Sequence, residues 1–340
     1  MDFLQKIYDD QLNAEGDIEI EGYIFFRAQI LKELEEETYN VLYKDWLDTR
    51  RKGLLERADT IINLRSNKLR VEKLIKAFNG GSLVPFIGAG MSIPSDYPGW
   101  TKFLYKICEE SDYPETELAE LLSKGAYEEA AQRIHDDLSS GLFNEQLENE
   151  FSSEKEILGP IQYLPLLFPS HFVLTTNFDN LLERVFFNIG EQFEGIKSGK
   201  ELNECAKHLA DGSRFLVKLH GTCNQLLNRV LTYSEYENSY SKEDFLYKFF
   251  KRAMISKSFL FLGCSLSSDR TIKTMMQIVE EEGAEELPKH YALLSDIKSD
   301  DERKAKQKML AKANIFPIWY DGEHEECIEA ILLTLLETMP

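Results

Sequence analysis

Residues 83–92 read Leu83-Val84-Pro85-Phe86-Ile87-Gly88-Ala89-Gly90-Met91-Ser92, an apolar run followed at once by a glycine-rich turn. The apolar half is short and β-prone, and Lys102-Phe103-Leu104-Tyr105-Lys106-Ile107 downstream predicts a helix. A strand, a glycine turn and a nearby helix can cradle a phosphate, because glycines let the backbone approach the anion and free amides point at it. The same pattern also closes many ordinary strand-to-helix turns, so this stretch alone leaves the ligand open.

Three further segments have the same character and follow in order along the chain. They are Val173-Leu174-Thr175-Thr176-Asn177-Phe178-Asp179, Val217-Lys218-Leu219-His220-Gly221 and Phe259-Leu260-Phe261-Leu262-Gly263-Cys264-Ser265-Leu266. Each is an apolar, strand-like run that ends in small or polar residues. Because ligands bind at the carboxyl ends of the strands in an open parallel sheet, these strand ends together predict one pocket.

The whole chain is predicted to have an α/β fold. Strand-like and helical segments alternate after residue 82, which predicts a Rossmann-like, doubly wound parallel sheet. Residues 76–340 would form this domain, with an inserted helical subdomain at about 110–160. Residues 1–75 are predicted to be an N-terminal helical extension, because Tyr23, Phe26, Ile30 and Leu34 recur at helical spacing. Those helices would pack on the core or on a neighbouring subunit.

Composition limits the classes of partner. The chain has 340 residues, 43% of them hydrophobic, with a formal net charge of -20, so it can bury a sizeable core while repelling nucleic acid phosphates. We find no signal peptide and no apolar run long enough for a bilayer, and we therefore expect a cytoplasmic protein. The 5 cysteines show no pairing pattern, which is typical of reduced thiols.

The motifs resemble those of the sirtuin family of NAD-consuming enzymes. That family carries Gly-Ala-Gly-x-Ser, Thr-Gln-Asn-x-Asp, His-Gly and Gly-Thr-Ser-Leu in this order, which residues 88–92, 175–179, 220–221 and 263–266 match. Protein-deacylating sirtuins also have two Cys-x-x-Cys pairs after the His-Gly, and these four cysteines bind zinc. Residues 222–258 of this chain contain a single cysteine, Cys223. The chain is thus more similar to the zinc-less branch of bacterial antiphage systems, and we expect no zinc.

The resemblance implies three catalytic residues. Asn177 would orient a water molecule and hold a ribose hydroxyl, although an asparagine at this place can also cap a helix. Asp179 would bind the nicotinamide carboxamide, cap the helix that starts near Asn180, or do both. His220 would be the base, since histidine titrates near neutral pH, and the alternative is a core histidine.

The resemblance also implies a set of residues that contact NAD. Trp100 would close over the nicotinamide or pack in the core, and Cys264, where the family has threonine, would be a small packing residue. The segment Leu231–Tyr236 would form a lid or a simple loop. The NAD contacts implied are Gly88, Ala89, Gly90, Ser92, Trp100, Thr176, Gly263, Cys264, Ser265 and Leu266.

The resemblance also implies a function. The protein would be an NAD⁺ glycohydrolase that releases nicotinamide and ADP-ribose, and it would act as the toxic effector of an abortive-infection system. The alternatives are a module that senses NAD or ADP-ribose without turnover, and an NAD-dependent protein deacylase. A toxic activity has to be silent until needed, so we expect a homo-oligomer and a regulator: a translocase-type ATPase, an Argonaute-like protein or a phage trigger.

Overall fold

The computed structural model describes residues 2–198, 201–202, 213–225, 229–240, 245–266 and 270–339. The chain divides into two units, Met1–Thr60 and Ile61–Pro340. This division falls before residue 75, where we placed it, because helix α4 (Asn67–Asn79) packs on strands of the main sheet. The buried side chain of Asn67 fixes the helix there, since its Nδ2 donates to the Trp319 carbonyl at 2.6 Å and its Oδ1 accepts from the Trp319 amide at 3.1 Å.

The N-terminal unit contains a β-hairpin that the helical spacing did not predict. The N-terminal unit consists of α1 (Asp2–Ala14), β1 (Ile18–Ile20), β2 (Tyr23–Phe25), α2 (Arg27–Leu34) and most of α3 (Glu36–Asn63). Tyr23 therefore lies in a strand and not in a helix. The cause is the two-residue turn at Glu21 and Gly22, whose φ values of 52° and 83° suit a tight hairpin turn.

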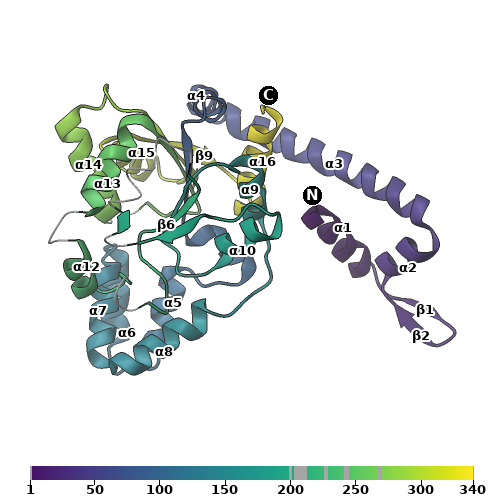
Figure 1. Ribbon diagram of the computed structural model, residues 1–340, viewed down its shortest axis with the longest axis horizontal. Helices are drawn as coiled ribbons and strands as arrows, with labels where there is room; N and C mark the ends of the chain where they lie inside the picture. Colours follow the sequence, from purple (N-terminus) through teal and green to yellow (C-terminus); the bar gives the residue numbers. More distant parts are fainter. Residues whose placement is uncertain are drawn as a thin grey trace. The chain divides into compact units, whose positions relative to one another are not determined.

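The main unit is built on a seven-stranded sheet in the order β5-β6-β4-β3-β7-β8-β9 (Figure 1), and all of its strand pairs are parallel. The strands are β3 (Leu83–Ile87), β4 (Val173–Thr175), β5 (Gly195–Lys197), β6 (Phe215–Lys218), β7 (Ser258–Leu262), β8 (His290–Ser295) and β9 (Ile315–Tyr320). Leaving out the edge strand β5, which we had not predicted, the order is that of dinucleotide-binding folds. The predicted Rossmann-like α/β class is thereby confirmed.

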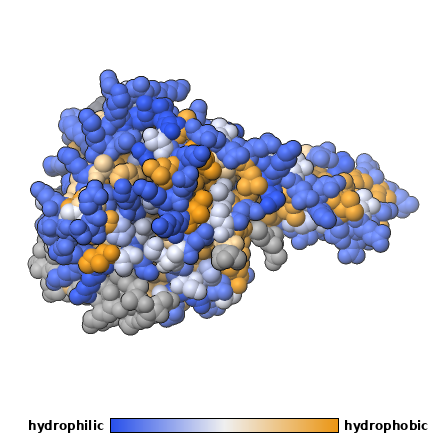
Figure 2. All heavy atoms as spheres, turned by 90° about the horizontal axis from the view of Figure 1, so that it is seen from above, coloured by the Kyte–Doolittle hydropathy of each residue, from blue (hydrophilic) through white to orange (hydrophobic). Residues whose placement is uncertain are grey.

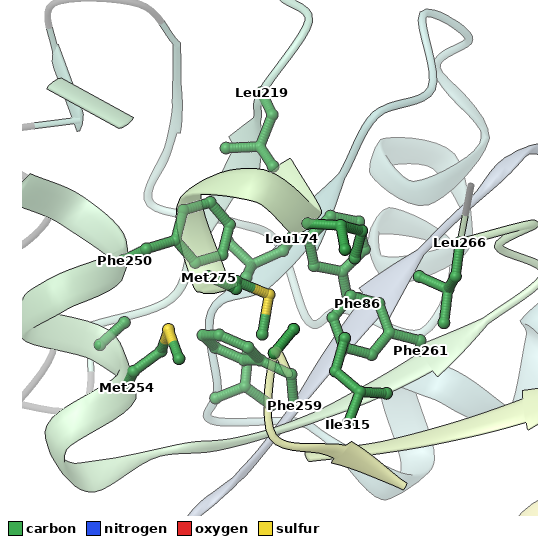
Figure 3. Close-up of a cluster of buried hydrophobic side chains, with 14 of the residues drawn as sticks. Phe86, Leu174, Leu219, Phe250, Met254, Phe259, Phe261, Leu266, Met275 and Ile315 are labelled. Atoms are coloured by element: carbon green, nitrogen blue, oxygen red, sulfur yellow. The ribbon is translucent and has the colours of Figure 1, made fainter. Parts of the chain in front are cut away.

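The central strands are apolar because both of their faces are covered. Every residue of β3 and β7 is buried, as expected for strands with helices on both sides of a parallel sheet. The rings of Phe86 on β3 and Phe261 on β7 contact each other at a tilt, with centroids 4.7 Å apart, and Leu174 of β4 lies in the same hydrophobic cluster (Figure 3). This core holds the strand ends, and therefore the loops that follow them, in fixed positions.

Four helices follow β3, the first strand of the main sheet, and form a group (Figure 1). They are α5 (Trp100–Cys108), α6 (Glu115–Ser123), α7 (Tyr127–Asp137) and α8 (Ser140–Phe151), and α5 contacts each of the other three. Helices α6, α7 and α8 lie within the predicted insertion at about 110–160.

The remaining elements connect or cover the strands. Three short 3₁₀ turns are η1 (Ala89–Met91), η2 (Ile93–Ser95) and η3 (Pro160–Tyr163). The helices are α9 (Leu164–Leu167), α10 (Leu181–Asn188), α12 (Tyr233–Tyr240), α13 (Phe245–Ser256), α14 (Arg270–Glu282), α15 (Asp300–Ala311) and α16 (His324–Glu337).

The surface is mainly polar. Figure 2 shows hydrophilic residues over most of the face it presents, with small apolar patches between them. Across the described ranges, none of the helices combines the length and the apolar character that a membrane span requires.

Candidate functional site

A cavity of about 1200 Å³ lies at the carboxyl ends of the central strands. It exceeds the roughly 300–1,000 Å³ typical of small-molecule pockets. Residues after each of the four predicted strands line it: Gly88, Ala89 and Gly90 after β3, Thr176 after β4, His220 after β6, and Gly263, Cys264, Ser265 and Leu266 after β7. Trp100 lines it as well. The structure thus brings ten of the thirteen predicted site residues to one cavity.

The glycines at this site allow two loops to touch. A Cβ atom on Gly88 would lie 2.5 Å from the Gly263 carbonyl oxygen, and one on Gly263 would lie 2.5 Å from the Met91 nitrogen. The amides of Gly88 and Gly90 donate to the carbonyls of Leu262 and Gly263, both at 2.9 Å. These two amides are therefore engaged and do not point at an anion, which corrects our first explanation of the glycine turn.

Asn177 is held by a short chain of hydrogen bonds between β3 and β4. The Thr175 hydroxyl donates to the Ile87 carbonyl at 2.9 Å and accepts from the Asn177 amide at 3.0 Å. The Asn177 Nδ2 then donates to the Ser92 hydroxyl at 3.0 Å. Its Oδ1 is buried and accepts no hydrogen bond from the described residues, which leaves one polar atom for a ligand or a water molecule.

Asn177, Asp179 and Ser92 are missing from the described residues that line the cavity. All three are buried, with 5%, 4% and 2% of their surfaces exposed. They lie close together, because Asn177 and Asp179 each share a hydrogen bond with Ser92. In this structure they are therefore buried outside the cavity lining.

Asp179 caps a helix, which is one of the roles we considered for it. Its Oδ1 accepts from the Leu181 amide at 3.1 Å, at the first residue of α10. Burial raises the pKa of Asp179, and the positive charge of Lys218 opposes this shift. The carboxylate also accepts a hydrogen bond from Ser92, so it joins the helix cap to the loop after β3.

Lys218 is a site residue that we did not predict. It is 1% exposed, and its Nζ donates to the Asp179 carbonyl at 2.7 Å and to Glu183 Oε1 at 2.8 Å. It therefore fixes the loop that carries Asn177 and Asp179. A lysine inside the apolar run Val217-Lys218-Leu219 was the signal, because a buried lysine needs partners.

His220 lies against aromatic rings at the edge of the cavity. The ring centroids of His220 and Trp100 are 5.9 Å apart, and Trp100 makes an edge contact with Phe178 at 5.1 Å. Burial lowers the pKa of His220 to about 4, against an opposing hydrogen bond with the Thr176 backbone. The imidazole is therefore neutral at pH 7 and can accept a proton.

The segment Leu231–Tyr236 leads into helix α12 and is not a simple loop. The Glu235 carboxylate accepts from the amides of Leu231 and Thr232 at 2.8 and 3.0 Å, which caps the helix. The hydroxyl of Tyr236 is 2.6 Å from His220 Nε2. The segment thus contacts the candidate base through Tyr236.

Both basic and acidic residues line the cavity. The lining includes Arg270, Lys102, Lys273 and Lys306, and also Asp96, Glu128 and Glu129, and Arg270 pairs with Glu128 at 2.9 Å. Lys306 Nζ donates to the carbonyls of Ser265 and Leu266 at 2.9 and 2.6 Å, so it also shapes the loop after β7. The lysines of the lining suit an anionic ligand such as a diphosphate.

His324, at the start of α16, is another lining residue that the sequence did not single out. Its Nδ1 shares a hydrogen bond with the Tyr320 hydroxyl, and its buried Nε2 has no partner among the described residues. A ligand could use this nitrogen.

Within the described ranges, no cluster of three or more His, Cys, Asp or Glu side chains is arranged to hold a metal ion. Cys205 lies outside those ranges. Cys264 packs against the carbonyl oxygens of Phe86 and Leu262 at 3.7 and 3.5 Å, as a small packing residue would.

Comparison with known proteins identifies the central part of the chain. Residues 171–318 match the family model of the SIR2-like domain; the match begins before β4, after the glycine turn at 88–92, and ends within β9. Defense-associated sirtuin 2 of Bacillus subtilis is 25% identical over 229 residues, which is 66% of this chain and 22% of that protein.

Two relatives named NAD(+) hydrolase ThsA are also similar. That of Bacillus cereus is 27% identical over 213 residues, covering 62% of this chain and 42% of the relative. That of Acinetobacter baumannii is 22% identical over 234 residues, covering 69% of this chain and 46% of the relative. The chain spans less than half the length of each of these relatives. Residues 171–318 are thus similar to the SIR2-like domain, and the chain is similar over part of its length to sirtuin-like proteins.

Proposed function

We propose that the protein is an NAD⁺ hydrolase that cleaves NAD⁺ to nicotinamide and ADP-ribose. The observation that carries the proposal is the single cavity at the ends of β3, β4, β6 and β7, where the family motifs meet. The relatives named NAD(+) hydrolase support it. So do the lysines of the lining, because NAD⁺ carries a diphosphate.

The reaction does not need a general acid for the leaving group. The nicotinamide ring is already cationic, so it leaves as a neutral molecule without a proton from the enzyme. Positive charge develops on the ribose as the C1′–N bond breaks, and the site has to orient the ribose and the attacking water. Neutral, hydrogen-bonding side chains suit this task.

We assign the central role to Asn177. Its Nδ2 is committed to Ser92, which fixes the amide plane, and its Oδ1 remains available to a ribose hydroxyl or a water molecule. Because the side chain is buried outside the cavity lining, NAD⁺ would reach it only after a small shift of the residues around it. Asp179 would contact the carboxamide with its carboxylate.

His220 would be the base. Its low pKa, about 4, keeps the imidazole neutral over the physiological pH range, so one ring nitrogen carries a lone pair. Trp100, which lines the cavity beside His220, would close over the nicotinamide ring.

We further propose that the activity serves antiphage defence by depleting NAD⁺, as an effector of abortive infection. The relative named defense-associated sirtuin 2 supports this placement. A separate regulator would trigger the enzyme: a translocase-type ATPase, an Argonaute-like protein or a phage protein. The N-terminal unit would mediate self-association.

The test compares the wild type with Asn177→Ala and His220→Ala. NAD⁺ is incubated with each purified protein, alone and in extract from phage-infected cells, and nicotinamide and ADP-ribose are separated by chromatography. We expect both products from the wild type in at least one condition and a loss of about 10²-fold or more in each variant. Intact NAD⁺ in both conditions would reject the proposal, and release by the variants at the wild-type rate would reject the assigned residues.

A further inference from the structure

One ring nitrogen of the candidate base already shares a hydrogen bond with a neighbouring side chain. Tyr236 and His220 both line the cavity, and the Tyr236 hydroxyl is 2.6 Å from His220 Nε2, the nitrogen that would accept a proton. Their rings meet edge to face, with centroids 5.6 Å apart and planes at 82°. A water molecule at the reaction centre would therefore meet the phenol oxygen before it meets the imidazole.

Tyr236 is held in this position through neighbouring residues. The Ser234 amide donates to Gln132 Oε1 of α7 at 2.9 Å, which fixes the start of α12. Upstream, Arg229 pairs with Glu235 and donates to Asn144 Oδ1 of α8 at 2.7 Å. The helix that carries Tyr236 is thus attached to both α7 and α8.

The guanidinium group of Arg270 also contacts the Tyr236 ring. Arg270 lies over the Tyr236 ring at 5.0 Å, and it pairs with Glu128 of α7 and Glu237 of α12, each at 2.9 Å. These contacts fix the ring in place.

We propose that Tyr236 is a catalytic residue that relays a proton from the attacking water to His220. The inference rests on the proposed hydrolysis. As the water oxygen bonds to C1′ and the C1′–N bond breaks, the bond's electron pair leaves with neutral nicotinamide. The water proton moves to the Tyr236 oxygen, while the Tyr236 proton moves to His220 Nε2. Tyrosine ends neutral, and the imidazole carries the positive charge.

The relay requires one arrangement of protons before the reaction. The Tyr236 hydroxyl donates to Nε2, so the proton of the neutral imidazole sits on Nδ1. Nitrogen-15 NMR distinguishes the two tautomers, which gives a readout that does not depend on turnover.

The decisive variant is Tyr236→Phe, which removes one oxygen atom. The matched control is Tyr247→Phe on α13, whose hydroxyl contacts Glu281 and which lies outside the set of described residues lining the cavity. Thermal unfolding of both variants checks that each is folded.

We expect Tyr236→Phe to lower kcat by about 10²-fold, in the range of general-base effects, with KM within about twofold of the wild type. Tyr247→Phe should behave as the wild type does. The NMR spectrum should show a neutral, Nδ1-protonated His220 in the wild type and a changed Nε2 shift in Tyr236→Phe only.

Three results would overturn the relay. An active wild type with unchanged or increased kcat in Tyr236→Phe rejects the relay and leaves the hydrolysis standing, and increased kcat would make Tyr236 a block on His220. An Nε2-protonated His220 in the wild type reverses the hydrogen bond on which the relay depends. A wild type that releases no nicotinamide, alone or in infected extract, rejects the proposed function and the relay with it.

Discussion

The contact between the loops after β3 and β7 can be tested with one methyl group. In Gly263→Ala the new Cβ would lie 2.5 Å from the Met91 nitrogen and 2.8 Å from the Gly90 carbonyl carbon. Both are backbone atoms and cannot rotate away. Gly263 also has a φ of +65°, which costs an alanine about 1–2 kcal/mol. Adding about 1–3 kcal/mol for overpacking gives a total of about 2–5 kcal/mol.

Gly81→Ala is the matched control, because Gly81 has a φ of +66° and an added Cβ would meet no atom within 4 Å. It should cost only the conformational part, about 1–2 kcal/mol. The entropy that alanine removes from the unfolded chain is common to both variants and cancels in the difference. Urea denaturation measures both free energies of unfolding. A difference below about 0.5 kcal/mol would refute the close-contact explanation of the glycines.

Three further predictions concern a buried cation, a buried histidine and the N-terminal unit. Lys218→Met should lower the free energy of unfolding by about 1.5–3 kcal/mol, because it removes a charged hydrogen bond to the Asp179 carbonyl; urea denaturation at the wild-type value would contradict this. His290 accepts from the Phe259 amide at 3.0 Å, and burial lowers its pKa to about 3. Unfolded histidine binds a proton below about pH 6.5, so this group should reduce stability between pH 6.5 and 3 by up to about 1.4 kcal/mol per pH unit. His290→Asn keeps an acceptor and does not titrate, so its stability measured against pH should fall less steeply; equal slopes would exclude His290 as the source. Ile24 on β2 is 72% exposed, and Ile24→Asp should reduce the mass measured by light scattering if the N-terminal unit self-associates, whereas a monomeric wild type would exclude the oligomer.

The fold of the main unit was predictable because its signals are local and repeated. Apolar runs that end in small or polar residues mark parallel strands buried on both faces, and the helices between them follow from apolar spacing. Edge strand β5 was missed because Gly195–Lys197 is only three residues long and is not apolar throughout. The hairpin was missed because the turn at Glu21 and Gly22 outweighed a helical spacing that continued across it.

The candidate site was predictable in its location but not in its contacts. The strand ends indicated which loops would meet, and the cavity lies where they do. The use of the glycine amides depends on how closely the loop after β7 approaches, which no local pattern encodes. Several contacts join residues that are far apart in the sequence. The separation is 35 residues for Lys218 and Glu183, 142 for Arg270 and Glu128, and 16 for Tyr236 and His220, so these contacts became visible only in three dimensions.

The most direct test of the central claim is NAD⁺ turnover in water enriched in oxygen-18. The wild-type protein, alone and in infected-cell extract, is incubated with NAD⁺, and the products are examined by mass spectrometry. Hydrolysis at this site predicts ADP-ribose carrying one oxygen-18 atom, in amounts equal to nicotinamide and absent with Asn177→Ala. Intact NAD⁺ in both conditions, or a product without oxygen-18, would contradict the account.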